Sequence, residues 1–312
     1  MSTLDSVEEI QRGFTDCGYI STTRISTAVF LAHKLEKPVL VEGPAGVGKT
    51  ELAKTAAQYL GLPLTRLQCY DGLDEAKALY EWKYAKQLLY TQVLKDHMGE
   101  LLDGATSLDQ SVDRLHSFDD VFFSERFLEP RPLLSALRQP KGGVLLIDEI
   151  DKSDEEFEAL LLEILSDFQI SIPEIGTIKA TVRPLVFLTS NNTREMSDAL
   201  KRRCLHLHIP FPSRKVEAQI VAARVPEVST HLNQQLVDFV QALRTLDLRK
   251  HPSVAETIDW ARTLLLMHAK ELGADVVRNT LNVLLKFEDD IEIAERGLSE
   301  LLNSARRRSV AH

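Results

Sequence analysis

The chain has 312 residues, 44% of them hydrophobic, which is enough for a full core and argues against global disorder. Its 37 basic and 46 acidic residues give a formal net charge of −9, so broad, non-specific binding to nucleic acid or to a membrane surface is not expected. The N-terminus lacks the charged-then-apolar order of a signal peptide, and no apolar run approaches the roughly 20 residues that span a bilayer. Together with three widely spaced cysteines without a CxxC motif, these features predict a cytoplasmic protein without a membrane span.

Five short apolar runs alternate with helical stretches over the first two-thirds of the chain. This alternation is typical of an α/β protein with a parallel sheet. The third and fourth runs contain no polar residues, as expected of strands that are covered on both faces. The predicted strands are residues 39–41, 64–70, 144–147, 185–188 and 205–211.

Helical periodicity predicts helices over residues 51–60, 75–95 and 153–168. The first ends at Gly61, and Ser153 with Glu156 has the spacing of a capping box at the start of the third. Residues 99–132 have weak periodicity and are expected to contain a loop.

Residues 169–181 alternate around a Pro-Glu-Ile-Gly turn, which predicts a β-hairpin. After Pro212 only helical patterns remain, over residues 215–225, 231–246, 253–267 and 276–302. We therefore predict an α/β domain over residues 1–212 and an all-helical domain over residues 213–312.

The segment GPAGVGKT matches the phosphate-binding pattern GxxxxGK[ST] and lies between a predicted strand and a predicted helix. Its glycines let successive N–H groups point at phosphate oxygens, and the helix N-terminus adds a favourable dipole. In this pattern the lysine reaches the β- and γ-phosphates and the threonine binds Mg²⁺. The sequence therefore predicts that ATP and Mg²⁺ are bound by Gly43, Pro44, Ala45, Gly46, Val47, Gly48, Lys49, Thr50 and the adjoining Glu51.

Asp148 and Glu149 end the third predicted strand. Asp148 suits a Mg²⁺-organising carboxylate, and Glu149 suits a base that polarises the attacking water. The alternative is that two acids simply begin a solvated loop, but acids are unfavourable at the end of a buried strand without a positive partner. A kinase has little use for such a glutamate, so the pair favours hydrolysis of ATP.

Polar and basic residues follow the fourth strand. Asn191, or else Asn192, can orient water or contact the γ-phosphate, although an asparagine pair also favours a turn. Arg202 and Arg203 can reach the ATP site of a neighbouring subunit, or form a solvated basic helix end. The residues alone do not decide between these two roles of the arginines.

Taken together, these motifs resemble the AAA+ superfamily and, within it, the MoxR group of ATPases. The matching segments are GPAGVGKT, VLLIDEID, FLTSNNTRE and DALKRRC, followed by helical patterns. The resemblance implies a five-stranded sheet of order 5-1-4-3-2, a helical lid and a homo-oligomeric, hexameric ring. It also implies an insert at about residues 71–92 and a hairpin at about 169–181 that precedes the sensor.

The resemblance also implies roles for individual residues. Asn191 takes the sensor 1 position, and Arg203 with Arg202 takes that of the arginine finger. Tyr19 and Ile20 lie where such proteins contact the adenine. One departure is the lid helix near residue 253, which has no arginine at the sensor 2 position; Arg249 and Lys250 just before it are possible substitutes.

Three longer strings are similar to the CoxD-type branch of that group: CYDGLDEAKALYEWKYAKQLLYTQ, EEFEALLLEILSDFQISIPEIGTI and HPSVAETIDWA. That resemblance implies maturation of carbon monoxide dehydrogenase or a related molybdenum hydroxylase, together with a von Willebrand factor A (VWA) domain partner. Two alternatives remain. One is a DNA-acting motor or loader, which the net charge disfavours, and the other is an ATP-gated regulatory scaffold.

Overall fold

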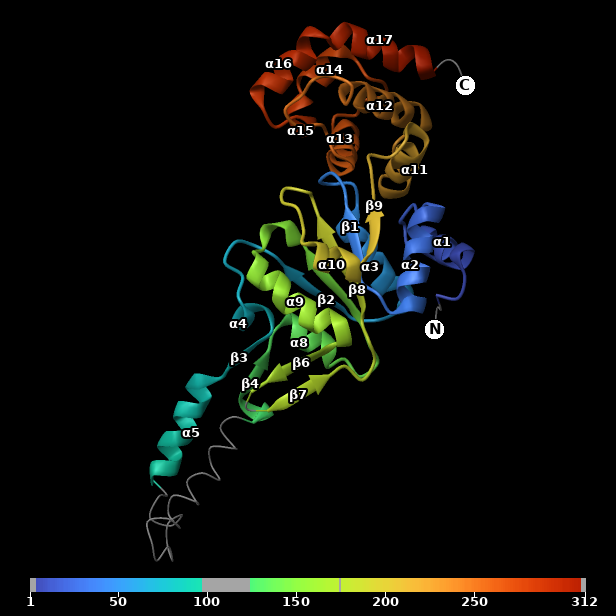
Figure 1. Ribbon diagram of the computed structural model, residues 1–312. Coiled ribbons are helices and arrows are strands. Elements are labelled where there is room, and N and C mark those ends of the chain that lie inside the picture. The colour runs from blue at the N-terminus through green and yellow to red at the C-terminus, as the bar shows by residue number, and fades with distance from the viewer. Residues whose placement is uncertain (1–3, 97–123, 174, 310–312) are drawn as a thin grey trace, which may run out of the picture.

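A computed structural model describes residues 4–96, 124–173 and 175–309 (Figure 1). At its centre is a five-stranded parallel sheet of order β2-β5-β8-β1-β9. Numbered along the chain, these strands stand in the order 5-1-4-3-2 when read from β9, as the resemblance implied. The strands are β1 (Val39–Glu42), β2 (Leu64–Gln68), β5 (Val144–Asp148), β8 (Leu185–Ser190) and β9 (Leu205–His208).

Helices cover both faces of the sheet, which explains the apolar runs without alternation. In β5, Val144 and Leu146 pack on one face, whereas Leu145 and Ile147 pack on the other. The first face is covered by α1 (Val7–Asp16), α2 (Thr23–Leu35) and α3 (Lys49–Leu60), and the second by α8 (Pro132–Leu137), α9 (Glu155–Asp167) and α10 (Asp198–Arg203).

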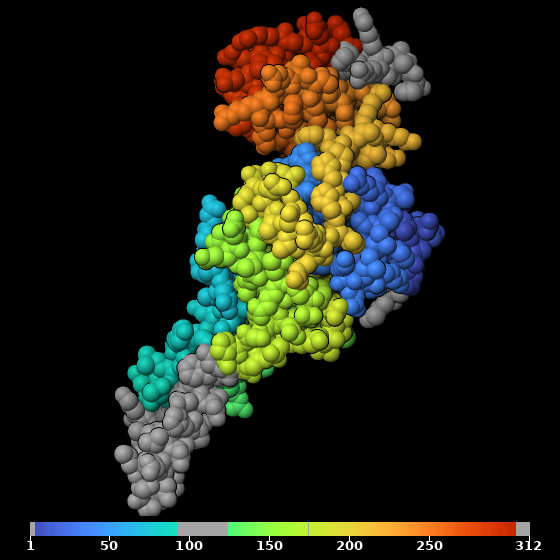
Figure 2. Space-filling view, viewed as in Figure 1, coloured from blue at the N-terminus to red at the C-terminus, as the bar shows by residue number. Residues whose placement is uncertain are grey.

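The prediction of one continuous helix over residues 75–95 was wrong, because the middle of this segment forms a strand. The chain forms α4 (Glu75–Ala78), then β3 (Tyr80–Trp82), then α5 (Tyr84–Asp96). β3 pairs antiparallel with β4 (Leu128–Pro130), and Trp82 becomes part of the core. This tertiary gain outweighs the local helical preference. α5 then extends away from the sheet (Figures 1 and 2).

The predicted loop over residues 99–132 falls largely outside the described residues, since the structure resumes at Ser124. A short 3₁₀ helix, η1 (Glu125–Phe127), then leads into β4. The predicted hairpin is confirmed: β6 (Gln169–Ile172) pairs antiparallel with β7 (Gly176–Lys179).

The predicted capping box of α9 was wrong. The hydroxyl of Ser153 donates to the carbonyl of Ile150, because Ser153 ends the preceding 3₁₀ turn η2 (Ile150–Lys152). The helix is instead capped by Asp154, whose carboxylate accepts from the N–H of Phe157 at 2.8 Å.

The rest of the described chain is helical and has an apolar core of its own (Figure 1). The predicted helix over residues 276–302 is broken into four, because Thr280 bonds to buried Trp260, Leu285 turns to an extended conformation and Gly297 ends a helix. The elements are α11 (Arg214–Arg224), α12 (Thr230–Leu243), α13 (Val254–Leu266), α14 (Ala274–Arg278), α15 (Leu281–Leu284), α16 (Glu288–Arg296) and α17 (Leu298–Ser309).

Figure 2 shows the orange-to-red helices meeting the rest of the molecule over a narrower region, where blue and yellow segments contact them. A division into two domains at Pro212 stays a prediction. None of the helices in the described residues is long and apolar enough to cross a membrane.

Candidate functional site

The loop between β1 and α3 has the left-handed backbone that its glycines permit. Gly46 has φ +72° and Gly48 has φ +97°, and α3 begins directly afterwards at Lys49. A Cβ on Gly46 would lie 2.5 Å from the hydroxyl oxygen of Ser253, so the loop also packs directly against the start of α13. The N–H of Ala255 donates to the carbonyl of Gly46 at 3.3 Å. The loop and the helical part are therefore in contact at the site where phosphates are expected.

Lys49 is buried and donates three hydrogen bonds. Its Nζ lies 2.8 Å from each of three acceptors: the carbonyls of Gly43 and Pro44 and Oδ1 of Asn191. Burial lowers the pKa of Lys49, although nearby Asp151 and other carboxylates counteract that effect. All three N–H groups of the ammonium are used. A phosphate would have to replace some of these oxygen atoms.

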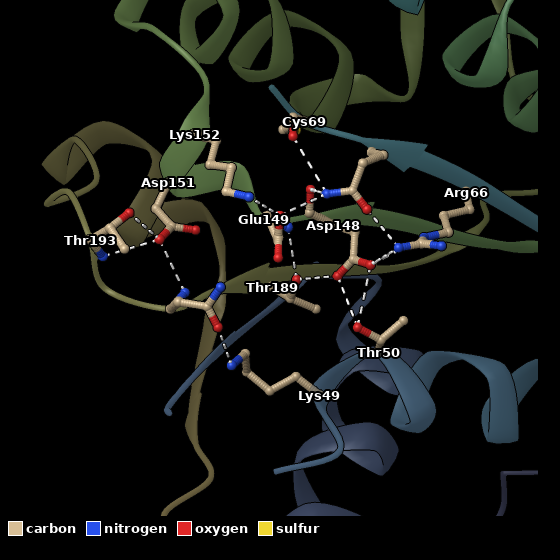
Figure 3. Close-up of polar contacts among 12 residues, drawn as sticks. Lys49, Thr50, Arg66, Cys69, Asp148, Glu149, Asp151, Lys152, Thr189 and Thr193 are labelled. Atoms are coloured by element: carbon tan, nitrogen blue, oxygen red, sulfur yellow. Dashed lines mark hydrogen bonds and ion pairs between the residues drawn. The ribbon is translucent and has the colours of Figure 1, made fainter. Parts of the chain in front are cut away.

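Asp148 lies at the end of β5 and is 3% exposed. Its Oδ1 accepts hydrogen bonds from the hydroxyls of Thr50 at 3.0 Å and Thr189 at 2.5 Å (Figure 3). Its Oδ2 accepts from Arg66, whose Nε and Nη2 lie at 3.1 and 2.6 Å. The hydroxyl of Thr50 beside a carboxylate supplies the hard oxygen ligands that Mg²⁺ prefers, so these residues fit the ion.

Glu149 has a left-handed backbone, φ +57°, which costs a non-glycine residue about 1–2 kcal/mol. Its N–H donates to the hydroxyl of Thr189 at 2.9 Å, which holds the turn. Its Oε2 accepts from Gln68 at 3.0 Å and lies 2.6 Å from Nζ of Lys152 (Figure 3). In this state the carboxylate is therefore engaged by two donors from its own chain.

Asp151 is a further carboxylate, 4% exposed, that the motif analysis did not single out. Its Oδ2 accepts from the N–H of Asn191, and from both the N–H and the hydroxyl of Thr193. Burial alone would raise the pKa of Asp151, but the hydrogen bonds from Thr193 and Asn191 outweigh it and lower the pKa. This carboxylate fixes the loop that carries Asn191 toward Lys49. Asn192, with φ +59°, makes the turn itself.

Arg202 and Arg203 lie at the end of α10 and are exposed. Arg203 donates to the hydroxyl of Ser166 on α9, and the side chain of Arg202 makes no hydrogen bond or ion pair with any residue that the structure describes. The structure does not join either arginine to the P-loop or to Asp148 of the same chain. Glu158 anchors this helix, because its carboxylate accepts from the N–H of Ser197 at 3.0 Å.

A cavity of about 650 Å³ lies between the P-loop and the helical part. Tyr19 and Ile20 line it from the α/β side, together with Gly48, Thr50 and Glu51. Tyr19 is buried, and burial raises the pKa of its hydroxyl, so it remains neutral. The wall is largely apolar near these residues, as expected where a planar base would be held.

The helical part contributes apolar side chains and two arginines to the cavity, namely Val216, Ile258, Arg224 and Arg262. Nη2 of Arg224 lies 3.0 Å from a carboxylate oxygen of Glu51. Neither Arg249 nor Lys250 lines the cavity: Arg249 stacks on Phe287 and Lys250 pairs with Glu256. The expectation that these two replace a sensor 2 arginine is therefore not supported.

Four residues that contact the site were not singled out from the sequence: Arg66, Gln68, Thr189 and Asp151. Arg66 and Gln68 share one face of β2, and the register pairs Gln68 with Asp148. That face could have been deduced only after the neighbouring strands were known. Thr189 and Asp151 lay inside the quoted motifs but carried no signal of their own.

Comparison with known proteins identifies the family of the chain. Residues 38–204 match the AAA domain family, dynein-related subfamily. The denitrification regulatory protein NirQ of Stutzerimonas stutzeri is 26% identical over 228 residues, which cover 70% of this chain and 68% of that protein. NirQ of Pseudomonas aeruginosa is 24% identical over 243 residues, which cover 76% of each.

Among solved structures, the RuvB Holliday junction branch migration motor of Thermotoga maritima is 18% identical, with a TM-score of 0.47 over 90% of this chain and 72% of that one. The matched family segment includes the P-loop, Asp148, Glu149, Asn191 and both arginines of α10. The chain belongs to the AAA domain family, in its dynein-related subfamily.

Proposed function

We propose that this chain is a MoxR-group AAA+ ATPase that hydrolyses ATP with Mg²⁺ in a ring and uses the cycle to remodel a partner protein. The observation that carries the proposal is the convergence of Lys49, Thr50, Asp148, Glu149 and Asn191 at the carboxyl ends of neighbouring parallel strands. Ligands bind at this edge of open α/β sheets.

In this proposal the P-loop amides and Lys49 bind the phosphates, and the base lies against Tyr19 and Ile20. Lys49 exchanges its carbonyl and amide acceptors for phosphate oxygens. Thr50 and Asp148 hold Mg²⁺, which neutralises charge on the phosphates. The remaining chemistry belongs to side chains that act on water.

Glu149 acts as the base that takes a proton from the attacking water, once its carboxylate exchanges Gln68 and Lys152 for that water. Asn191 orients the water or contacts the γ-phosphate. Asp151 keeps Asn191 in place through the hydrogen bond from the N–H of Asn191.

The arginines of α10 complete the site of a neighbouring subunit. Arg202 is exposed and without a partner among the described residues, while Arg203 makes one contact with Ser166. An exposed guanidinium without an ion pair among the described residues can stabilise charge on a γ-phosphate in the next chain. We therefore propose a homo-oligomeric ring, a hexamer by resemblance.

The proposed output is maturation of a metalloenzyme of the molybdenum hydroxylase type, with a VWA-domain partner, in the cytoplasm. The resemblance to CoxD-type sequences supports this choice. The net charge of −9 favours a protein client over nucleic acid.

Subunit mixing tests the shared site. The double variant Arg202→Ala with Arg203→Ala, and separately Lys49→Ala, should each lose most ATP turnover. Their mixture should recover part of it, because some interfaces combine an intact Lys49 with an intact arginine pair. The matched control mixes the arginine double variant with a triple variant that lacks all three side chains, and it should show no recovery. Absence of recovery in assembled mixed rings would refute the finger in trans.

Partner capture tests the output. The Glu149→Gln form, loaded with ATP, is used to capture proteins from native cells, with Lys49→Ala as the control that cannot hold nucleotide. A VWA-domain protein or a metalloenzyme should be retained only by the first form. Salt-sensitive retention of DNA would instead favour a DNA-acting motor.

A further inference from the structure

We propose that Arg66 is a cation that stands in for Mg²⁺ at Asp148: it neutralises this carboxylate before the metal nucleotide arrives and is displaced when it does. The inference deepens the proposed function and rests on it, because it concerns how the same ATP site takes up its metal. Arg66 would then set how strongly nucleotide binding depends on Mg²⁺.

The geometry places the guanidinium on one oxygen of the carboxylate. Nε and Nη2 of Arg66 both donate to Oδ2 of Asp148, at 3.1 and 2.6 Å (Figure 3). The hydroxyls of Thr50 and Thr189 donate to Oδ1, with Thr50 also 3.3 Å from Oδ2. The oxygen atom nearest the guanidinium is therefore covered by a positive group.

A buried carboxylate has to be compensated by a cation or by several hydrogen-bond donors. Asp148 is 3% exposed, and a charge that is buried without compensation is strongly destabilising. Lys49 bonds to Gly43, Pro44 and Asn191 instead, and Lys152 pairs with Glu149. Within residues 4–96, 124–173 and 175–309, the one ion pair of Asp148 is with Arg66.

Arg66 can also leave without opening the core. β2 is an edge strand of the sheet, and the side chain of Arg66 is 48% exposed. Gln68, two residues along on the same face, offers an acceptor, since its Oε1 lies 2.6 Å from Nη2 of Arg66. The guanidinium therefore has a second contact that it can keep while it gives up the carboxylate.

Competition for one carboxylate has a thermodynamic consequence. If Arg66 and Mg²⁺ exclude each other at Asp148, then removing Arg66 makes metal binding easier. Without metal, the same change leaves the negative charge of Asp148 facing the phosphates, and nucleotide binds more weakly. A purely structural ion pair would instead weaken binding equally with and without Mg²⁺.

The test measures the dissociation constant of mant-ADP, a fluorescent nucleotide that is not hydrolysed, for the full chain in Mg²⁺ and in EDTA. Replacement of Arg66 by Met should raise the ratio of the EDTA to the Mg²⁺ value by about tenfold or more. Arg66→Lys, which keeps the charge, should raise it less. Arg183→Met, which removes an exposed pair with Glu36, is the matched control and should leave the ratio unchanged.

A second variant covers the possibility that an unpaired Asp148 prevents folding. Arg66→Met combined with Asp148→Asn removes both charges and should bind mant-ADP with little dependence on Mg²⁺. An unchanged ratio in Arg66→Met, or equal weakening in both conditions, would overturn the inference while leaving the proposed function intact. Failure of the wild-type chain to bind mant-ADP in either condition would overturn the proposed function itself.

Discussion

Replacing Arg244 with Met should leave a buried carboxylate without its partner in the helical part. Nη1 and Nη2 of Arg244 each lie 2.7 Å from an oxygen of Glu217, in a two-pronged pair. The side chain of Glu217 is 0% exposed and that of Arg244 is 8% exposed. Gln241 and Thr257 complete the shell of Glu217, at 2.7 and 2.9 Å, but neither carries a charge.

The expected loss is large because the remaining carboxylate cannot reach water. Breaking a buried pair by removing one partner costs about 3–5 kcal/mol of unfolding free energy. Arg244 also donates to the carbonyl of Pro252 at 2.8 Å and stacks on the ring of Phe211. Since Pro252 precedes the start of α13, which lies against Gly46, nucleotide affinity should fall as well.

Urea unfolding followed by tryptophan fluorescence measures the effect. Trp260 is fully buried in the helical core, and a Trp82→Phe background leaves its signal alone. The matched control is Arg296→Met, which loses a pair with Glu292 whose side chains are 76% and 57% exposed, and should change stability far less. Adding Glu217→Gln to Arg244→Met should recover much of the loss.

A change in Arg244→Met no larger than in the Arg296→Met control would refute the reasoning. So would a double variant that is less stable than Arg244→Met alone, because the destabilisation would then not arise from the unpaired charge of Glu217.

Two further predictions concern the loops around the phosphates. Gly46→Ala should lower nucleotide affinity and the melting temperature, because the new Cβ would meet Ser253. The control is Gly61→Ala, since Gly61 also has a positive φ, +63°, but a Cβ there would have no atom within 4 Å. Nucleotide binding by Gly46→Ala at the level of that control would contradict the clash. Asp151→Ala should destabilise the nucleotide-free chain by roughly 1–3 kcal/mol and slow turnover by releasing Asn191. The pKa of Asp151 is lowered in the folded state, so its stabilisation is present above pH of about 4 and is lost as the pH falls through the folded pKa. The difference in unfolding free energy between wild type and Asp151→Ala should therefore become smaller in acid.

Periodicity and turn residues within short segments were enough to predict several elements of the fold. The P-loop, the five strands and the hairpin were predictable because each carries its own periodicity or turn residues. The order of the strands came from the resemblance, not from their periodicity.

Contacts between distant segments were not predictable in the same way. β3 forms because Trp82 can enter the core and pair with β4, which no window around residues 75–95 reveals. Arg66 reaches Asp148 only through the register of two parallel strands. Asp151 gains its importance from Thr193, which is 42 residues away.

The central claim is that this chain hydrolyses ATP with Glu149 as the base. Its most direct test measures two quantities for Glu149→Gln: the rate of phosphate release and the amount of nucleotide that the variant binds. The account predicts that this variant holds ATP and Mg²⁺ as well as wild type does, while turnover falls by about 10²–10⁴-fold. Lys49→Ala, which should lose the nucleotide itself, separates a binding defect from a chemical one. Turnover close to wild type in Glu149→Gln would contradict the account.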